Sequence, residues 1–154
     1  MSDPREPVLV SACLLGAECR YDGRHNRDGA LEREFAVRGL HAVPFCPEEH
    51  GGLGTPRPAA WIERESAEAV LDGSARVVTH AGVDVTSAFV KGADGALATC
   101  QAHGIRRAFL KERSPSCGSC ATHVGGALVA GPGVTTALLQ RNGIAVEGVE
   151  GRRA

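Results

Sequence analysis

Val8-Leu-Val-Ser-Ala12 leads directly into Cys13-Leu-Leu-Gly16. The first of these two segments is short, apolar and β-branched, which indicates a strand that is buried on both faces. The second segment ends in glycine, which indicates that the strand runs into a loop. The junction therefore places Cys13 just beyond the carboxyl end of a predicted strand.

A second strand and an intervening helix complete a β-α-β unit. His41-Ala-Val-Pro-Phe45 is the second apolar run, and it stops at Cys46-Pro47 because proline cannot continue a strand ladder. Residues 30–38 carry apolar side chains at helical spacing, and Gly39 supplies a helix stop. Cys46, like Cys13, is therefore expected at the carboxyl end of a strand.

The same alternation of helices and strands continues along the chain. Residues 51–58 are too rich in glycine and proline for a regular element and are expected as a loop. The later elements are a helix that starts near Asp84 or Thr86 and ends at Gly104, strands at 105–110 and 144–149, and a helix at 135–141. This pattern predicts an α/β fold, a single Rossmann-like domain with a mainly parallel sheet and helices on both faces. The domain is expected over residues 8–149, with short tails at 1–7 and 150–154.

The composition narrows the class of protein. The chain has 154 residues, of which 43% are hydrophobic and 23% charged, and its formal net charge is -1. A near-neutral chain has no excess of positive charge to attract phosphates, and 4% aromatic residues leave few rings to stack on bases. Nucleic acid is therefore not expected as the principal partner. No apolar run is long enough for a membrane span, and the polar N-terminus does not resemble a signal peptide, so a cytoplasmic location is expected.

The 6 cysteines are the main chemical signal in the chain. In a cytoplasmic protein they are expected as reduced thiols available for metal, cluster or redox chemistry. Cys13, Cys46 and Cys117 each follow a predicted strand, and such ends meet at one edge of a parallel sheet, where ligands bind. Soft sulfur ligands favour zinc, copper(I) or iron–sulfur clusters. Three separated cysteines favour a 4Fe-4S cluster with one iron left open to substrate.

The remaining cysteines receive other interpretations. Cys100 lies on the apolar stripe of a helix and is expected in the core. Cys19 lies in a polar loop and is expected as an incidental exposed thiol. Cys120, as partner of Cys117 in a Cys-x-x-Cys pair, is either a redox dithiol, a fourth ligand or neither. The glycine-rich helix start at residues 131–135 either binds an anion or is pinned against the sheet.

Several motifs in the same order along the chain resemble the DUF523 family, which includes the 2-thiouracil desulfurases. The motifs are Val10-Ser-Ala-Cys-Leu-Leu-Gly16, Arg20-Tyr-Asp-Gly23, Cys46-Pro-Glu48, Gly51-Gly-Leu-Gly-Thr-Pro-Arg-Pro58, Gly82-Val-Asp-Val-Thr86, Lys111-Glu-Arg-Ser-Pro-Ser-Cys-Gly118 and Gly133-Val-Thr-Thr-Ala-Leu-Leu139. The resemblance runs from about Val8 to Val146. It departs from the family pattern at residues 119–125 and at Trp61, which both are expected to border the substrate pocket.

The resemblance implies an enzyme that removes sulfur from thiolated pyrimidine bases such as 2-thiouracil and releases the oxo base and sulfide. It implies a 4Fe-4S cluster on Cys13, Cys46 and Cys117, which is the same triplet that the strand ends bring together. It also implies two catalytic residues, Glu48 and Ser116. The implied partner is a small thiolated base, with neither nucleic acid nor membrane as principal partner.

The resulting hypothesis is a desulfuration without net electron transfer. An open iron would act as a Lewis acid toward the thiocarbonyl group, and Glu48 would deprotonate the attacking water. Ser116 would bind the substrate or relay a proton. For Glu48 the alternative is a structural role in the loop of Cys46. For the whole chain the alternatives are a zinc- or redox-sensing protein without catalysis, or another reaction on the open iron.

Overall fold

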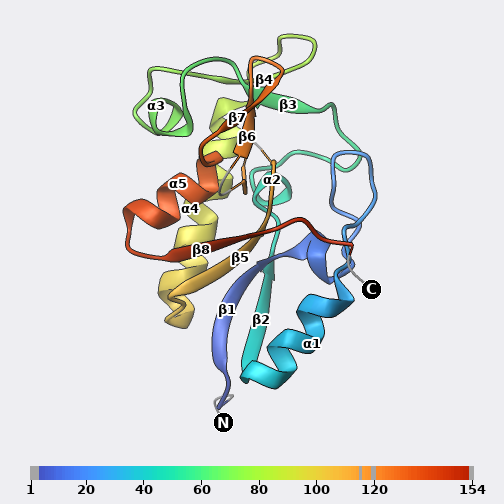
Figure 1. Cartoon of the computed structure of the whole chain (residues 1–154). Helices are drawn as coiled ribbons and strands as arrows, with labels where there is room; N and C mark the ends of the chain where they lie inside the picture. The colour runs from blue at the N-terminus through green and yellow to red at the C-terminus, as the bar shows by residue number, and fades with distance from the viewer. Residues whose placement is uncertain (1–3, 115, 119–120, 153–154) are drawn as a thin grey trace.

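The computed structural model describes residues 4–114, 116–118 and 121–152, and these residues form two sheets (Figure 1). The larger sheet has the order β2-β1-β5-β8, and every pair of neighbours in it is parallel. Its strands are β1 (Glu6–Ser11), β2 (Leu40–Phe45), β5 (Arg107–Lys111) and β8 (Ala145–Val149). The predicted parallel sheet is therefore confirmed.

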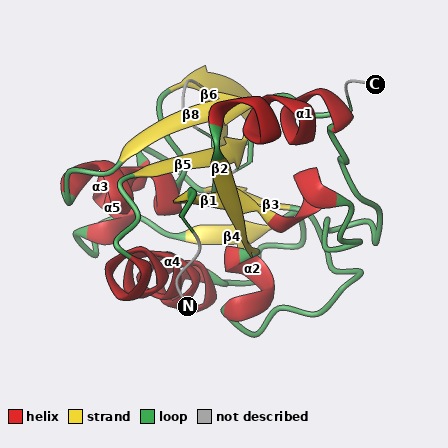
Figure 2. Ribbon diagram, turned by 90° about the horizontal axis from the view of Figure 1, so that it is seen from below, coloured by secondary structure: helices red, strands yellow, loops and turns green. Residues whose placement is uncertain are grey.

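Helices cover both faces of this sheet (Figure 2). They are α1 (Gly29–Arg38) on one face, and α4 (Thr86–His103) and α5 (Val134–Arg141) on the other. Successive residues of a strand point to opposite faces, so Val8 and Val10 pack in a core that contains Leu31 and Phe35 of α1. Leu9 packs in a second core with Ala96 of α4 and Leu139 of α5.

Local signals in the sequence explain where the long helices begin and end. The Asp28 carboxylate accepts a hydrogen bond of 2.9 Å from the Leu31 amide and caps α1. Gly39 and Gly104 follow α1 and α4 with φ values of 69° and 65°, a left-handed conformation that side chains disfavour. The predicted stops at these two glycines are confirmed.

A second sheet was not expected from the sequence. It has the order β4-β3-β6-β7, with antiparallel pairs β3–β4 and β6–β7 and a parallel pair β3–β6. Its strands are β3 (Ala60–Ile62), β4 (Val77–Thr79), β6 (Ala121–Val124) and β7 (Ala127–Ala130), and the short helix α3 (Ala67–Leu71) packs nearby. The prediction of one sheet is wrong here, because strands of three or four residues are too short to show an alternating pattern.

Two short helical segments follow the first two strands. The 3-10 helix η1 (Ala12–Leu15) follows β1, and α2 (Pro47–His50) follows β2. Glycines allow α2 to lie directly on α4, since a Cβ atom at Gly92 would lie 2.1 Å from the Pro47 carbonyl oxygen. This close packing fixes the segment that carries Cys46 and Glu48.

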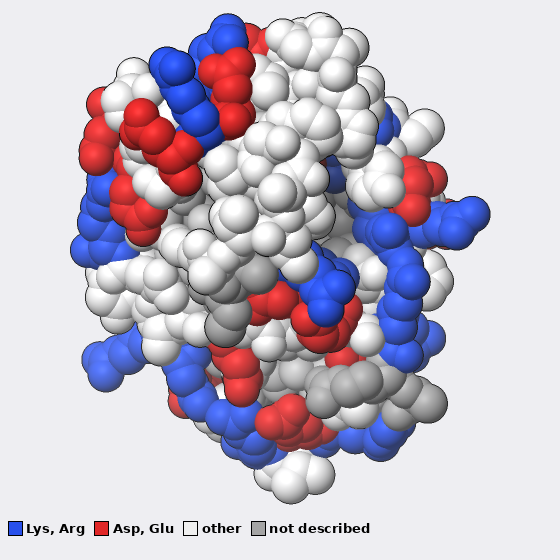
Figure 3. Space-filling model, turned by 45° about the horizontal axis from the view of Figure 1, so that its top comes forward, with Lys and Arg blue, Asp and Glu red and all other residues white. Residues whose placement is uncertain are grey.

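Acidic and basic side chains lie next to one another on the face shown in Figure 3.

The C-terminal residues are attached to the fold. Residues 150–152, expected as part of a tail, contact the body of the fold, because the Arg152 amide donates to the Asn26 carbonyl oxygen at 3.2 Å. Within the described ranges, no helix combines the length and the apolar character needed to cross a membrane.

Candidate functional site

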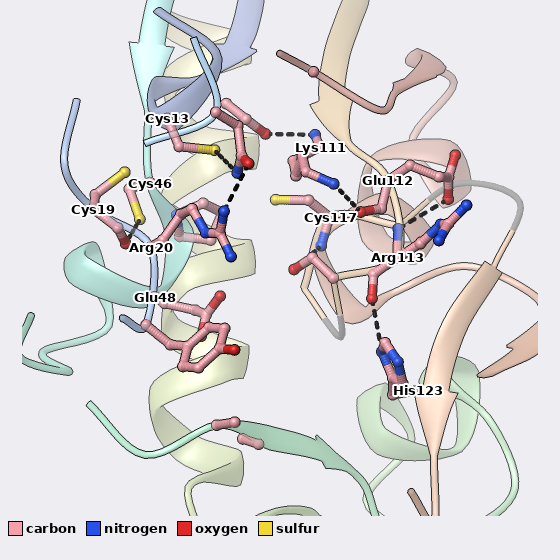
Figure 4. Close-up of a pocket in the computed structure, with 18 of the residues that line it drawn as sticks. Cys13, Cys19, Arg20, Cys46, Glu48, Lys111, Glu112, Arg113, Cys117 and His123 are labelled. Carbon is pink, nitrogen blue, oxygen red and sulfur yellow. Dashed lines mark hydrogen bonds between the residues drawn. The ribbon is translucent and has the colours of Figure 1, made fainter. Parts of the chain in front are cut away.

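A cavity of about 780 Å³ lies between the two sheets, beyond the carboxyl ends of β1, β2 and β5. The predicted cysteines Cys13, Cys46 and Cys117 all line it, and so does Glu48 (Figure 4). The second sheet contributes Trp61. The predicted convergence of the three strand-end cysteines is thus present in the structure.

Cys13 is held in a polar environment although it is buried. The Asn26 side-chain amide donates a hydrogen bond to its sulfur at 3.5 Å. A contact with the Cys19 thiol, this amide, and the charges of Lys111 and Arg20 lower the pKa of the Cys13 thiol to about 7 against the effect of burial. A thiolate therefore forms readily at Cys13, and the thiolate is the form of cysteine that binds metals.

Cys46 and Cys117 differ in their surroundings. A hydrogen bond from Cys19 and one from the backbone at Glu49 lower the pKa of the Cys46 thiol despite its burial. Burial raises the pKa of the Cys117 thiol to about 12. The negative charges of Cys46 and Cys13 reinforce this increase, so these sulfurs lie close enough to interact. A cationic iron centre would relieve the repulsion between three thiolates in one cavity.

The start of α5 fixes the loop of Cys117. The Thr135 amide donates to the Ser116 carbonyl oxygen at 2.8 Å, and the Thr136 hydroxyl donates to the Cys117 carbonyl oxygen at 2.8 Å. The glycine-rich helix start therefore packs against the loop of Cys117 rather than against the sheet, and the Thr135 amide donates to that loop.

Glu48 forms an ion pair with Arg57, whose Nε lies 3.3 Å from Glu48 Oε1. Burial raises the pKa of the Glu48 carboxyl group, while the charge of Arg57 and its hydrogen bond act in the opposite direction. Arg57 also donates from Nη2 to the Cys19 carbonyl oxygen at 2.9 Å. Sequence reasoning did not single out Arg57, although it lies within the Gly51–Pro58 motif.

Ser116 has no exposed surface, and it is not one of the residues that line the cavity. Its hydroxyl group shares a hydrogen bond of 2.8 Å with the Thr135 hydroxyl. A direct contact with a substrate would require Ser116 to exchange this partner. Its predicted catalytic role stays a prediction.

The remaining cysteine interpretations have mixed outcomes. Cys100 is 1% exposed in the core, as expected. Cys19 is 4% exposed, so the expectation of an exposed thiol is wrong. The hydrophilic sequence around Cys19 gave no sign that the loop folds inward over Cys13. Cys120 lies outside the described residues.

Trp61 lines the cavity from β3, as expected for a residue that borders the substrate pocket. Its ring packs on His80 with centroids 4.3 Å apart and an interplanar angle of 32°. Both rings line the cavity. Aromatic rings at the edge of a cavity suit a planar heterocycle.

The donor set fits an iron–sulfur cluster. Cys13, Cys46 and Cys117 offer sulfur from three separate loops around one cavity. Sulfur donors of this kind bind soft metals and clusters rather than magnesium or calcium. The carboxyl group of Glu48 shares the same cavity and supplies an acid–base group beside the sulfurs.

Comparisons with known proteins agree with this chemistry. The chain matches the model of the 2-thiouracil desulfurase family over residues 8–150. It is 42% identical over 142 residues to the uncharacterized protein YbbK of Bacillus subtilis (strain 168), a match that covers 90% of this chain and 93% of YbbK. It is 46% identical to a solved structure described as the 4Fe-4S-dependent thiouracil desulfidase TudS, with a TM-score of 0.78 and coverage of 94% of this chain and 91% of that one. The family match at residues 8–150 contains Cys13, Cys46 and Cys117.

Proposed function

Because the chain belongs to the 2-thiouracil desulfurase family, we propose that Cys13, Cys46 and Cys117 hold its 4Fe-4S cluster. The protein is a 4Fe-4S-dependent desulfurase that converts thiolated pyrimidine bases of the 2-thiouracil type to the oxo base and sulfide. The single observation that carries the ligand assignment is that these cysteines, far apart in sequence, line one cavity together with Glu48. The alternative of a zinc- or redox-sensing protein without catalysis has no support from the matches.

When bound, a cluster with one iron free of cysteine supplies a Lewis acid for a thiocarbonyl group. Glu48 is the general base in this proposal. Its buried position favours the neutral acid, while Arg57 favours the carboxylate, which is the form that accepts a proton from water. The ring carbon gains the oxygen of that water and loses its sulfur as sulfide. Glu48 then returns the proton to the departing sulfur, so no electrons are transferred.

Two further side-chain roles complete the proposal. Trp61 and His80, which line the cavity, bind the planar base with their aromatic rings. Ser116 supports the reaction from the loop of Cys117, either by turning its hydroxyl group from Thr135 to the substrate or by holding Cys117 in position. The two roles of Ser116 differ in whether its loss affects turnover alone or cluster binding as well.

The proposal also covers the location of the enzyme, the class of its partner and the extent of its domain. We place it in the cytoplasm, because cluster ligands have to remain reduced thiolates. The formal net charge of -1 and the mixed charges on the face in Figure 3 favour a small thiolated base over nucleic acid or a membrane as partner. Residues 8–149 form one Rossmann-like domain in this proposal, with the second sheet as an addition over the carboxyl edge of the parallel strands.

The decisive experiment is anaerobic reconstitution with iron and sulfide, followed by incubation with 2-thiouracil. About four irons per chain are expected, with formation of uracil and sulfide. Cys13→Ala, Cys46→Ala and Cys117→Ala should each lose the iron and the activity. Cys100→Ala is the matched control, because Cys100 is buried and is not one of the residues that line the cavity. Full iron loading without release of sulfide from 2-thiouracil would contradict the activity but not the ligand set.

A further inference from the structure

Cys19 lies beside two of the proposed cluster ligands. Its sulfur lies within 4.8 Å of the Cys46 sulfur. The Cys19 thiol also lowers the pKa of the Cys13 thiol, so these two groups interact. Figure 4 shows these three cysteines together on one side of the cavity, with Cys117 on the other. The desulfuration proposal gives Cys19 no role.

The backbone at Cys19 is fixed by the same network that positions Glu48. Arg57 Nη2 donates to the Cys19 carbonyl oxygen at 2.9 Å, and Arg57 Nε pairs with the Glu48 carboxylate. The Cys46 thiol contacts the same carbonyl oxygen at 3.8 Å. Cys19 is therefore held in place by groups of the site and is not an incidental thiol of a loose loop.

The chemistry of the neighbours determines what the Cys19 thiol can do. Cys13 and Cys46 have to be thiolates to bind iron, and a thiolate sulfur only accepts hydrogen bonds. The S–H group of Cys19 lies within 4.8 Å of the Cys46 sulfur and interacts with the Cys13 thiol, so it can donate to either sulfur after a small side-chain rotation. Hydrogen bonds to ligand sulfurs withdraw charge from a cluster, raise its reduction potential and stabilise its binding.

We infer that Cys19 is a positioning residue of the cluster site whose thiol donates a hydrogen bond to the ligand sulfur of Cys13 or Cys46. The inference rests on the proposed function, since it takes these two cysteines as ligands. It adds a polar contact that holds the ligand sulfurs in position.

The test compares Cys19→Ser, which keeps a donor, with Cys19→Ala, which removes it, and uses Cys100→Ala as control. All proteins are reconstituted anaerobically, and iron content, reduction midpoint potential and the rate of iron release to a chelator are measured. Cys19→Ala should bind iron at the normal stoichiometry, with a more negative potential and a several-fold faster release. Cys19→Ser should resemble the unsubstituted protein.

Two outcomes would overturn the inference. In one, Cys19→Ala has the same potential and the same release rate as the unsubstituted protein. In the other, both variants stay folded by circular dichroism but bind no cluster, which would make Cys19 an iron ligand. Failure of the proposed function looks different, because the unsubstituted protein itself would then take up no cluster.

Discussion

Arg57 Nε lies 3.3 Å from Glu48 Oε1, and the two side chains are 6% and 20% exposed. The pair joins the loop at residues 51–58 to the short helix after Cys46. Because both side chains are largely removed from water, the loss of either one would leave an unpaired buried charge. The same guanidinium also reaches the Gly54 and Cys19 carbonyl oxygens.

Arg57→Ala should therefore both destabilise the fold and impair catalysis. The loss of one partner leaves a buried carboxylate unpaired, which costs about 3 kcal/mol of the free energy of unfolding. The pKa of Glu48 should rise further, because Arg57 lowers it in the intact protein. Chemical denaturation measures the first effect. The second appears as a shift of the pH profile of kcat toward higher pH.

The double substitution Glu48→Leu with Arg57→Met is the matched control for stability. It removes both charges and should recover much of the stability that Arg57→Ala loses. If Arg57→Ala were as stable as the unsubstituted protein, the ion pair would not stabilise the fold. Arg57 would then not be expected to control the pKa of Glu48.

Glu48→Gln should abolish most turnover while the cluster remains. The amide has nearly the shape of the carboxylate but cannot accept a proton from water. Loss of a general base lowers kcat by about 10²–10⁴-fold. Visible absorbance and iron content should stay at the level of the unsubstituted protein. An active Glu48→Gln variant would remove Glu48 from the mechanism.

The convergence of Cys13, Cys46 and Cys117 was predictable because it depends on a general rule. Parallel strands direct the loops after them to one edge, so a cysteine after each strand is enough to indicate a shared site. The apolar runs of β1 and β2 and the glycine stops of α1 and α4 are strong local signals.

The parts that sequence reasoning missed depend on contacts between distant segments. Cys19 is buried because its loop folds back over Cys13. Arg57 belongs to the site because its guanidinium group contacts both the Glu48 carboxylate and the Cys19 carbonyl oxygen. The second sheet contains strands of three or four residues, which are too short to show an alternation of apolar and polar residues. In each case the information lies in tertiary packing rather than in local spacing.

Trp61→Ala should weaken substrate binding more than catalysis. Trp61 and His80 both line the cavity, and loss of one aromatic ring that stacks on a base costs about tenfold in affinity. KM for 2-thiouracil should rise by about this factor, with a smaller change in kcat. Trp61→Phe is the control and should retain most of the affinity. An unchanged KM in Trp61→Ala would mean that the base binds elsewhere in the cavity.

Ser116→Ala separates the two roles proposed for Ser116. The substitution leaves the buried Thr135 hydroxyl without its partner, which costs about 1–2 kcal/mol of the free energy of unfolding. If Ser116 contacts the substrate, kcat should fall while the cluster binds normally. If it only positions Cys117, iron content should fall together with activity. Full activity at full iron content would exclude both roles.

Asn26→Ala should raise the pKa of the Cys13 thiol above about 7. The Asn26 amide donates to the Cys13 sulfur and stabilises the thiolate, so its removal favours the protonated thiol. In the cluster-free protein under reducing conditions, alkylation of Cys13 by iodoacetamide, followed by peptide mass spectrometry across a pH series, reports this pKa. The midpoint of the alkylation rate should move to higher pH, and Cys100, whose pKa is raised to about 11 by burial, should keep its low rate in both proteins. An unshifted midpoint for Cys13 would show that Cys19, Lys111 and Arg20 hold the thiolate without the amide.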